Sequence, residues 1–206
     1  MKNTIKAVAL GLSLLLANVC VSYAQDFQKG FAAYEKEDYA TALKEWRPLA
    51  DQGDAEAQFY LGRIYNKGQG VTQDYKEAAR LYGLAAAQGY ASAQYNLGLM
   101  YFNGQGVTQD YKEAARLYGL AAAQGDADAQ VNLGGMYFNG EGVIQDKVSA
   151  HMWFNIAASM CCTYTSRGVA DAVKNRDIIA KTMTASQLEK AQDLARECVK
   201  KNYKGC

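Results

Sequence analysis

The chain has 206 residues, of which half are hydrophobic and only one is proline. Its 22 lysine and arginine residues nearly balance its 21 aspartate and glutamate residues, so the formal net charge is +1. This balance argues against nucleic acid as a partner, because non-specific phosphate binding depends on clustered positive charge. The composition suits one array of helices, and the lysines at 200, 201 and 204 are interpreted as a solvated helix end.

The first residues are typical of a secretory signal peptide. Two lysines precede an apolar stretch over residues 7–17, and small residues stand at the cleavage positions that end at Ala24. We expect residues 1–24 to be removed, so that a periplasmic or secreted protein begins at Gln25. The stretch is shorter than the roughly 20 residues that span a bilayer, so no stable membrane insertion is expected after cleavage. A lipoprotein anchored at Cys20 is the alternative, disfavoured by the branched Val19 before it.

An internal repeat dominates the rest of the chain. The 22 residues from Gly68 to Gly89 occur again without change from Gly104 to Gly125, thirty-six positions later. A period between 20 and 50 residues indicates supersecondary units that bury their apolar faces only by stacking on one another.

Two sets of columns at this period predict two helices in each unit. Their members are three or four residues apart along the chain, the spacing of one helical face. Small residues surround a large ring in the second helix, and a glycine in the first helix is expected to let the facing backbone approach. The second-helix columns are Ala42, Ala78, Ala114 and Ala150; Trp46, Tyr82, Tyr118 and Phe154; and Ala50, Ala86, Ala122 and Ala158. The first-helix columns are Ala57, Ala93 and Ala129; Leu61, Leu97 and Leu133; Gly62, Gly98 and Gly134; and Tyr65, Tyr101 and Tyr137.

Residues at the helix boundaries agree with this division. Asp74 followed by Glu77, and Asp110 followed by Glu113, predict N-caps with a reciprocal acid at the third helical position. Glycines at 53, 89 and 125 are expected to close the second helices in a left-handed conformation. A loop with two glycines joins the helices of each full unit. We interpret it as structural and not as a phosphate loop, because it follows a helix and recurs in every full unit.

These residues resemble the Sel1-like repeat, a relative of the tetratricopeptide repeat. The shared pattern is A-x-A-Q-x-x-L-G-x-x-Y-x-x-G-x-G-V-x-x-D followed by A-x-x-x-Y-x-x-A-A-x-x-G. The resemblance implies an all-α, right-handed α-solenoid with a helical C-terminal cap. The expected parts are a tetratricopeptide-like helix pair at 26–54, Sel1-like units at 55–90, 91–126 and 127–162, and the cap at 163–206.

The cap is expected to contain two helices, one over Val169–Lys181 and one that begins after Thr184, with Gln187 completing a capping box. Removal of the signal peptide leaves four cysteines, and an even count in an exported chain favours disulfides. Three pairings are possible. A bond from one of the vicinal pair to Cys198 is preferred, because a vicinal bond is strained and this one would pin the last unit to the terminal helix. The disulfide candidates are Cys161, Cys162, Cys198 and Cys206.

Catalytic and metal-binding patterns are not found in the sequence. No serine lies in a known nucleophile motif, and the single histidine, His151, occupies a column of small or apolar residues, so it is interpreted as a partly buried structural residue. We expect no cofactor, no metal and no enzymatic activity. Cysteine-rich relatives of the family described as β-lactamases leave a cell-envelope enzyme or a cell-wall binder as the alternative. Those relatives carry a cysteine pair in each repeat, whereas residues 55–158 here contain none.

The resemblance to tetratricopeptide repeats implies a concave surface lined by the first helices. Its columns vary between units, as expected of a graded groove for an extended peptide or a partner helix. The alternative is that these side chains pack between units. We expect an adaptor or assembly factor that binds a protein or peptide partner. The candidate columns are Phe59, Tyr95 and Val131; Arg63, Leu99 and Gly135; and Asn66, Phe102 and Phe138.

Overall fold

The computed structural model describes residues 26–159 and 167–206, and it contains helices but no strand within those ranges. The predicted signal peptide, Cys161 and Cys162 lie outside the described residues. Residues 26–35 are helical and precede α2. The following helices are α2 (Tyr39–Asp51), α3 (Ala55–Lys67), α4 (Tyr75–Ala87), α5 (Ala91–Asn103), α6 (Tyr111–Ala122), α7 (Ala127–Asn139), α8 (Lys147–Ser159), α9 (Arg167–Ala180) and α10 (Ala185–Lys200).

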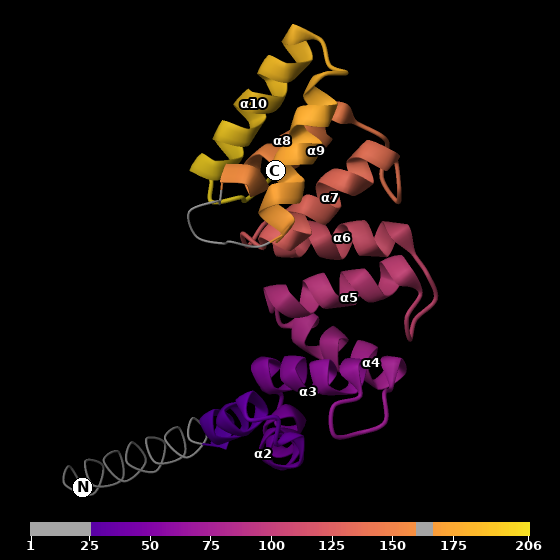
Figure 1. Cartoon of the computed structure of the whole chain (residues 1–206), viewed down its shortest axis with the longest axis vertical. Coiled ribbons are helices and arrows are strands. Elements are labelled where there is room, and N and C mark those ends of the chain that lie inside the picture. The colour runs from indigo at the N-terminus through magenta and orange to yellow at the C-terminus, as the bar shows by residue number, and fades with distance from the viewer. Residues whose placement is uncertain (1–25, 160–166) are drawn as a thin grey trace, which may run out of the picture.

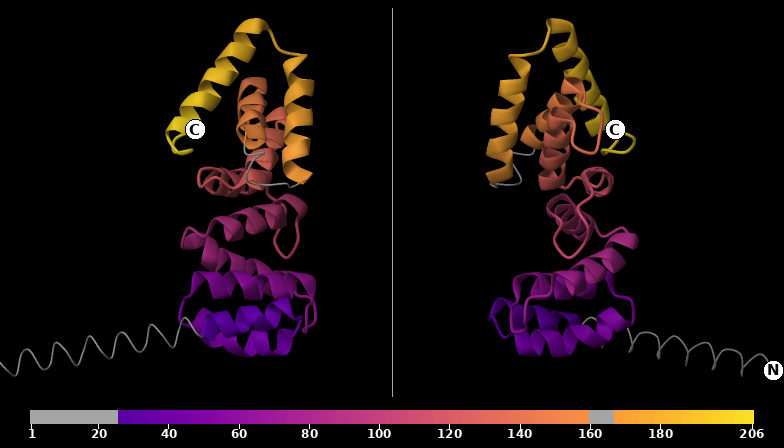
Figure 2. Two further views of the ribbon diagram at one scale, coloured as in Figure 1. Left: turned by 60° about the vertical axis from the view of Figure 1, so that its left-hand side comes forward. Right: turned by 90° about the vertical axis from the view of Figure 1, so that its right-hand side faces the viewer.

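The helices stack in chain order into an elongated solenoid, as Figures 1 and 2 show. Each of α3, α5 and α7 packs against the helix that follows it, and each pair then packs on the next pair. The helices α9 and α10 both contact α8 and close one end of the stack. The predicted all-α solenoid is confirmed.

Each first-helix glycine accommodates the large ring of the helix that follows. A Cβ atom placed on Gly98 would lie 2.8 Å from the ring of Tyr118, and one on Gly62 would lie 2.8 Å from the ring of Tyr82. The glycine therefore makes room for a side chain and not, as predicted, for a facing backbone. Gly30 stands in the same relation to Trp46, with 2.5 Å from its Cβ position to the indole. The first pair thus uses the same contact.

The N-caps form as predicted, but without the reciprocal bond. The Asp74 carboxylate accepts hydrogen bonds from the backbone N–H groups of Lys76 and Glu77 at 2.9 and 3.0 Å. The prediction that Glu77 bonds back to Asp74 is wrong, because the Asp74 N–H already donates to the carbonyl of Tyr65 at 3.0 Å. Glu77 instead pairs with Arg80, one turn further along α4, at 2.6 Å.

The glycines of the turns and loops have backbone reasons to be glycine. Gly53, Gly89 and Gly125 have φ values of +97°, +87° and +88°, which confirms the left-handed helix ends. Gly106, in the loop between α5 and α6, has a φ of +72°, and a Cβ there would overlap the Tyr75 carbonyl at the start of α4. The loop can therefore lie directly on the preceding unit.

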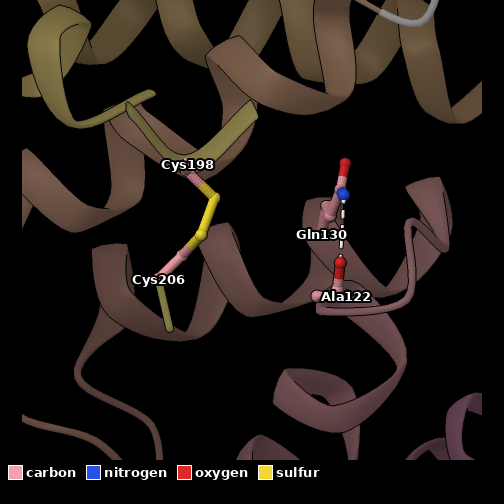
Figure 3. The surroundings of a disulfide bond; sticks show 4 residues. All are labelled: Ala122, Gln130, Cys198 and Cys206. Carbon is pink, nitrogen blue, oxygen red and sulfur yellow. Dashed lines mark hydrogen bonds between the residues drawn. A yellow bond between two sulfur atoms is a disulfide. The ribbon is translucent and has the colours of Figure 1, made fainter. Parts of the chain in front are cut away.

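A ladder of glutamines joins successive helices inside the stack. The side-chain amides of Gln58, Gln94 and Gln130 donate to the carbonyls of Ala50, Ala86 and Ala122 at 3.0, 3.1 and 3.2 Å (Figure 3 shows the last). The buried glutamine thus binds a carbonyl near the end of the preceding helix, where helical partners are missing. Sequence analysis did not identify this role, although these glutamines recur at the repeat period.

The cap confirms the two predicted helices and corrects the predicted disulfide. Thr184 and Gln187 form the capping box at the start of α10. Cys198 is bonded to Cys206, eight residues later, with 5.5 Å between their Cα atoms (Figure 3). The preferred pairing of Cys198 with Cys161 or Cys162 is therefore wrong. The chain turns back after α10, which brings Cys206 to the last turn of that helix.

Candidate functional site

Three of the predicted groove residues line one cavity on the inner side of α5 and α7. Leu99, Phe102 and Val131 meet there, together with Gly135 from the same predicted columns. The cavity has a volume of about 320 Å³. Its complete lining is Leu99, Phe102, Asn103, Tyr118, Val131, Asn132, Gly135, Met136, Asn139, Glu141, Phe154 and Asn175.

The floor of this cavity belongs to the core of the solenoid. Tyr118 of α6 and Phe154 of α8, 1 % and 2 % exposed, are the same rings that pack on the first-helix glycines. Gly135 opens the space above them, because a Cβ at that position would meet nothing within 4 Å. The floor is therefore rigid, and the opening depends on a missing side chain.

The polar part of the lining consists mainly of asparagines. Asn103 ends α5, Asn132 and Asn139 lie on α7, and Asn175 comes from the cap helix α9. A carboxamide both donates and accepts hydrogen bonds, as a peptide group does. The cavity thus combines an apolar floor with polar groups that match a polypeptide backbone.

Tyr95 lies beside this cavity and remains protonated at neutral pH. Burial raises the pKa of its phenol to about 12, and the nearby Asp128 and Asp126 act in the same direction, while a hydrogen bond with Asn132 opposes them. Its ring centroid lies 5.9 Å from that of Tyr118. The phenol is therefore a neutral donor and acceptor at the edge of the site.

The other predicted residues lie apart from the cavity. Phe59 is buried against Tyr82 and Tyr90, with ring centroids 5.9 and 5.1 Å away, and therefore packs between units. Arg63 is half-buried, with its guanidinium carbon 5.6 to 5.8 Å from the ring centroids of Tyr34, Phe59 and Tyr60. The backbone carbonyl of Asn66 accepts a bond from Gln73 at 2.8 Å.

The cap covers Phe138. This side chain packs on a cluster formed by α8 and α9 that includes Phe154, Ala172 and Ile179, with Val131 beside it. The inner surface is therefore closed at one end by α9. Asn175 of α9 joins the cavity there, and no repeat signal in the sequence could have identified it, because α9 lies outside the periodic region. Asn103 and Asn139 share one register and could have been identified.

Other reactive groups give no second candidate centre. Within residues 26–159 and 167–206, no three metal-ligating side chains cluster. His151 is 2 % exposed, more deeply buried than predicted, and burial together with Arg176 lowers its pKa. Its Nδ1 atom has no hydrogen-bond partner among the described residues. No helix in those ranges is long and apolar enough to cross a bilayer.

Comparisons with known proteins agree with the architecture. The model of the Sel1 repeat matches residues 55–90, 91–126 and 127–160. A Sel1 repeat protein from Oxalobacter formigenes has a similar structure, with a TM-score of 0.62 and 27 % identity over 86 % of this chain and 77 % of that one. So does a protective antigen of uropathogenic Escherichia coli strains that displays an SLR fold, with a TM-score of 0.59 and 28 % identity over 88 % of this chain.

The chain spans 47 % of the length of the Escherichia coli antigen. No curated protein matches the sequence. The three successive repeat matches cover just over half of the chain, and they coincide with the helix pairs α3–α4, α5–α6 and α7–α8. The chain belongs to the Sel1 repeat family.

Proposed function

We propose that this protein is an exported, non-enzymatic adaptor that binds an extended segment of another protein in the cavity between α5, α7 and α9. Sel1 repeat proteins generally mediate protein–protein interactions. The observation that carries the proposal for this chain is the cavity itself, in which a rigid apolar floor lies among four asparagines.

An extended segment fits this chemistry. Its backbone N–H and C=O groups have no partners of their own, and carboxamides can satisfy both kinds of group. Neighbouring packed helices lie about 8–10 Å apart, and an extended chain advances about 3.3 Å per residue, so about five or six residues would cross from α5 to α9. One apolar side chain of the segment would enter the space above Tyr118 and Phe154.

Export is the second part of the proposal. The N-terminal segment has the features of a cleaved signal peptide, and a disulfide such as Cys198–Cys206 persists in oxidising compartments. We expect periplasmic or secreted protein that starts at Gln25. Intact mass spectrometry of fractionated cells tests this expectation, and extracytoplasmic protein that retains residues 1–24 would contradict it.

A cavity-filling variant tests the binding site. Gly135→Leu places a side chain in the cavity without a packing clash, because a Cβ there has open space. Gly83→Leu is the matched control, since Gly83 is also helical with open space and lies outside the cavity. Partners of the mature protein are captured from envelope extract with cross-linking, purified, and titrated against each variant.

We expect Gly135→Leu to weaken binding at least about tenfold, which corresponds to about 1.4 kcal/mol, and Gly83→Leu to leave it unchanged. Equal affinity for both variants would overturn the site. Hydrolysis of a chromogenic β-lactam by the wild type, abolished by a single substitution, would overturn the non-enzymatic assignment.

A further inference from the structure

The C-terminal residues 201–206, here called the hook, turn back against the body of the solenoid. Asn202 and Tyr203 have φ values of +50° and +64°, a region that aromatic residues rarely occupy. The Tyr203 N–H donates to the carbonyl of Cys198 at 2.9 Å, and the disulfide joins Cys206 to the same residue. The hook is therefore a small ring closed on the last turn of α10.

The hook lies over a groove on the other side of α7 from the candidate site. This groove, here called the outer groove, has a volume of about 440 Å³. Its α7 residues, Leu133 and Tyr137, are two positions from Val131 and Gly135 of the cavity, about 200° around the helix. The full lining is Lys112, Ala115, Arg116, Gly119, Ala123, Leu133, Tyr137, Gly142, Val143 and Trp153, with Tyr203, Gly205 and Cys206 of the hook.

The contact between hook and groove is apolar. Tyr203 packs on the core cluster that contains Ala115, Leu133 and Trp153. Within the described residues, no hydrogen bond or ion pair joins the hook to α6, α7 or α8. Beyond Tyr203, one backbone bond, from Lys204 N–H to the Lys201 carbonyl at 3.2 Å, and the disulfide hold the end of the hook. The disulfide is thus the main restraint on this cover.

We propose that the outer groove is a second binding site, one that accepts an aromatic side chain carried on a tight turn of a partner protein. The hook occupies it in this chain while the Cys198–Cys206 bond is intact. The occupant's chemistry follows from the hook, which presents Tyr203 on such a turn to Trp153 and the small residues of α6. Opposite faces of α7 would then serve two partners.

Opening requires a thiol reductant. One thiolate of a dithiol attacks a sulfur of the Cys198–Cys206 bond to form a mixed disulfide, and its second thiol displaces the cysteine sulfur. The products are two cysteine thiols and the oxidised reductant, so two electrons and two protons pass to the protein. The left-handed residues at 202 and 203 can then relax, because the ring that imposes their conformation is open.

Tryptophan accessibility tests the cover. The chain has two tryptophans, Trp153 in the outer groove and Trp46 in the first pair, 4 % and 0 % exposed. We expect dithiothreitol to raise acrylamide quenching of the full mature chain severalfold, and the increase to be absent in Trp153→Phe. Cys198→Ala/Cys206→Ser should show the raised quenching without reductant. Unchanged quenching in both experiments would show that the hook stays in place, and would overturn the proposal.

A peptide tests the binding site. The probe is the peptide of residues 198–206 closed by its own disulfide, added to the Cys198→Ala/Cys206→Ser chain without reductant. We expect a saturable change in Trp153 fluorescence, which is lost when the tyrosine of the peptide is replaced by alanine. Adding Gly119→Gln, which fills the groove from a position with open space, should abolish binding, whereas Gly83→Gln should not. Binding that ignores either the tyrosine or Gly119→Gln would overturn the site, as would no binding to a chain with raised quenching.

Discussion

The second helices of the units have one register but different surroundings. Leu84 of α4 and Leu120 of α6 are 43 % and 41 % exposed, whereas Ile156, their counterpart in α8, is 1 % exposed. The difference comes from α10, which packs on that side of α8 alone. α8 is accordingly apolar on more of its circumference, with Met152 and Trp153 also buried. Register therefore determines the inner face of these helices, and the cap determines the outer face.

Replacing a ring of the inner column should have the largest effect, and the effect should be similar in capped and uncapped units. Tyr118→Ala and Phe154→Ala are each expected to lower the free energy of unfolding by about 3–5 kcal/mol, the usual cost of removing a buried aromatic side chain. Urea denaturation followed by circular dichroism measures the loss. Tyr111→Ala, at a ring that is 36 % exposed, is the control. A clearly smaller loss for Phe154→Ala would mean that the cap changes the inner face as well.

A charge on the outer face should separate the two environments directly. Ile156→Asp places a carboxylate beneath α10 and is expected to cost about 3 kcal/mol, because a buried unpaired charge loses its hydration. Leu120→Asp should cost at most about 0.5 kcal/mol, as at an ordinary surface position. Thermal melts of the paired variants give the comparison, and equal losses would show that α10 does not cover α8 in solution.

The glutamine ladder offers a smaller contrast. Gln94 accepts a bond from Gln124 at 2.8 Å, whereas Oε1 of Gln130 has no partner among the described residues. Replacement of either by leucine leaves a buried carbonyl unpaired, but only the change at Gln130 also removes an unpaired acceptor. Gln94→Leu should therefore be more destabilising than Gln130→Leu by about 1 kcal/mol. Chemical denaturation of the two variants tests the order, and the reverse order would contradict this account.

The smallest expected effect is a pH dependence of the capped unit. The pKa of His151 is lowered in the folded state, chiefly by burial and also by Arg176, although Asp177 opposes the change. Below the ordinary histidine pKa of about 6.5 the unfolded chain binds a proton first, so stability falls with pH until the folded-state pKa is passed. Unfolding free energies at pH 7 and pH 5.5 should differ less in His151→Leu than in the wild type. An identical pH dependence would show that His151 does not contribute.

The local structure of this protein could be predicted from its sequence. Helix pairs, N-caps and left-handed glycines depend on residues at most four positions apart, so the thirty-six-residue period reveals them. The pairing of Gly98 with Tyr118 also lay within the aligned columns, although the sequence did not show that the glycine accommodates a ring. The resemblance to the Sel1-like repeat likewise implied the solenoid before the structure was available.

Only the tertiary structure decided what the surfaces present. The cavity forms because α9 brings Asn175 to α5 and α7, and the outer face of α8 is buried because α10 returns beside it. The Cys198–Cys206 bond depends on a reversal of the chain after α10 that no spacing indicates. Periodicity fixes contacts inside a repeat, whereas these features depend on how segments outside the repeat pack against it.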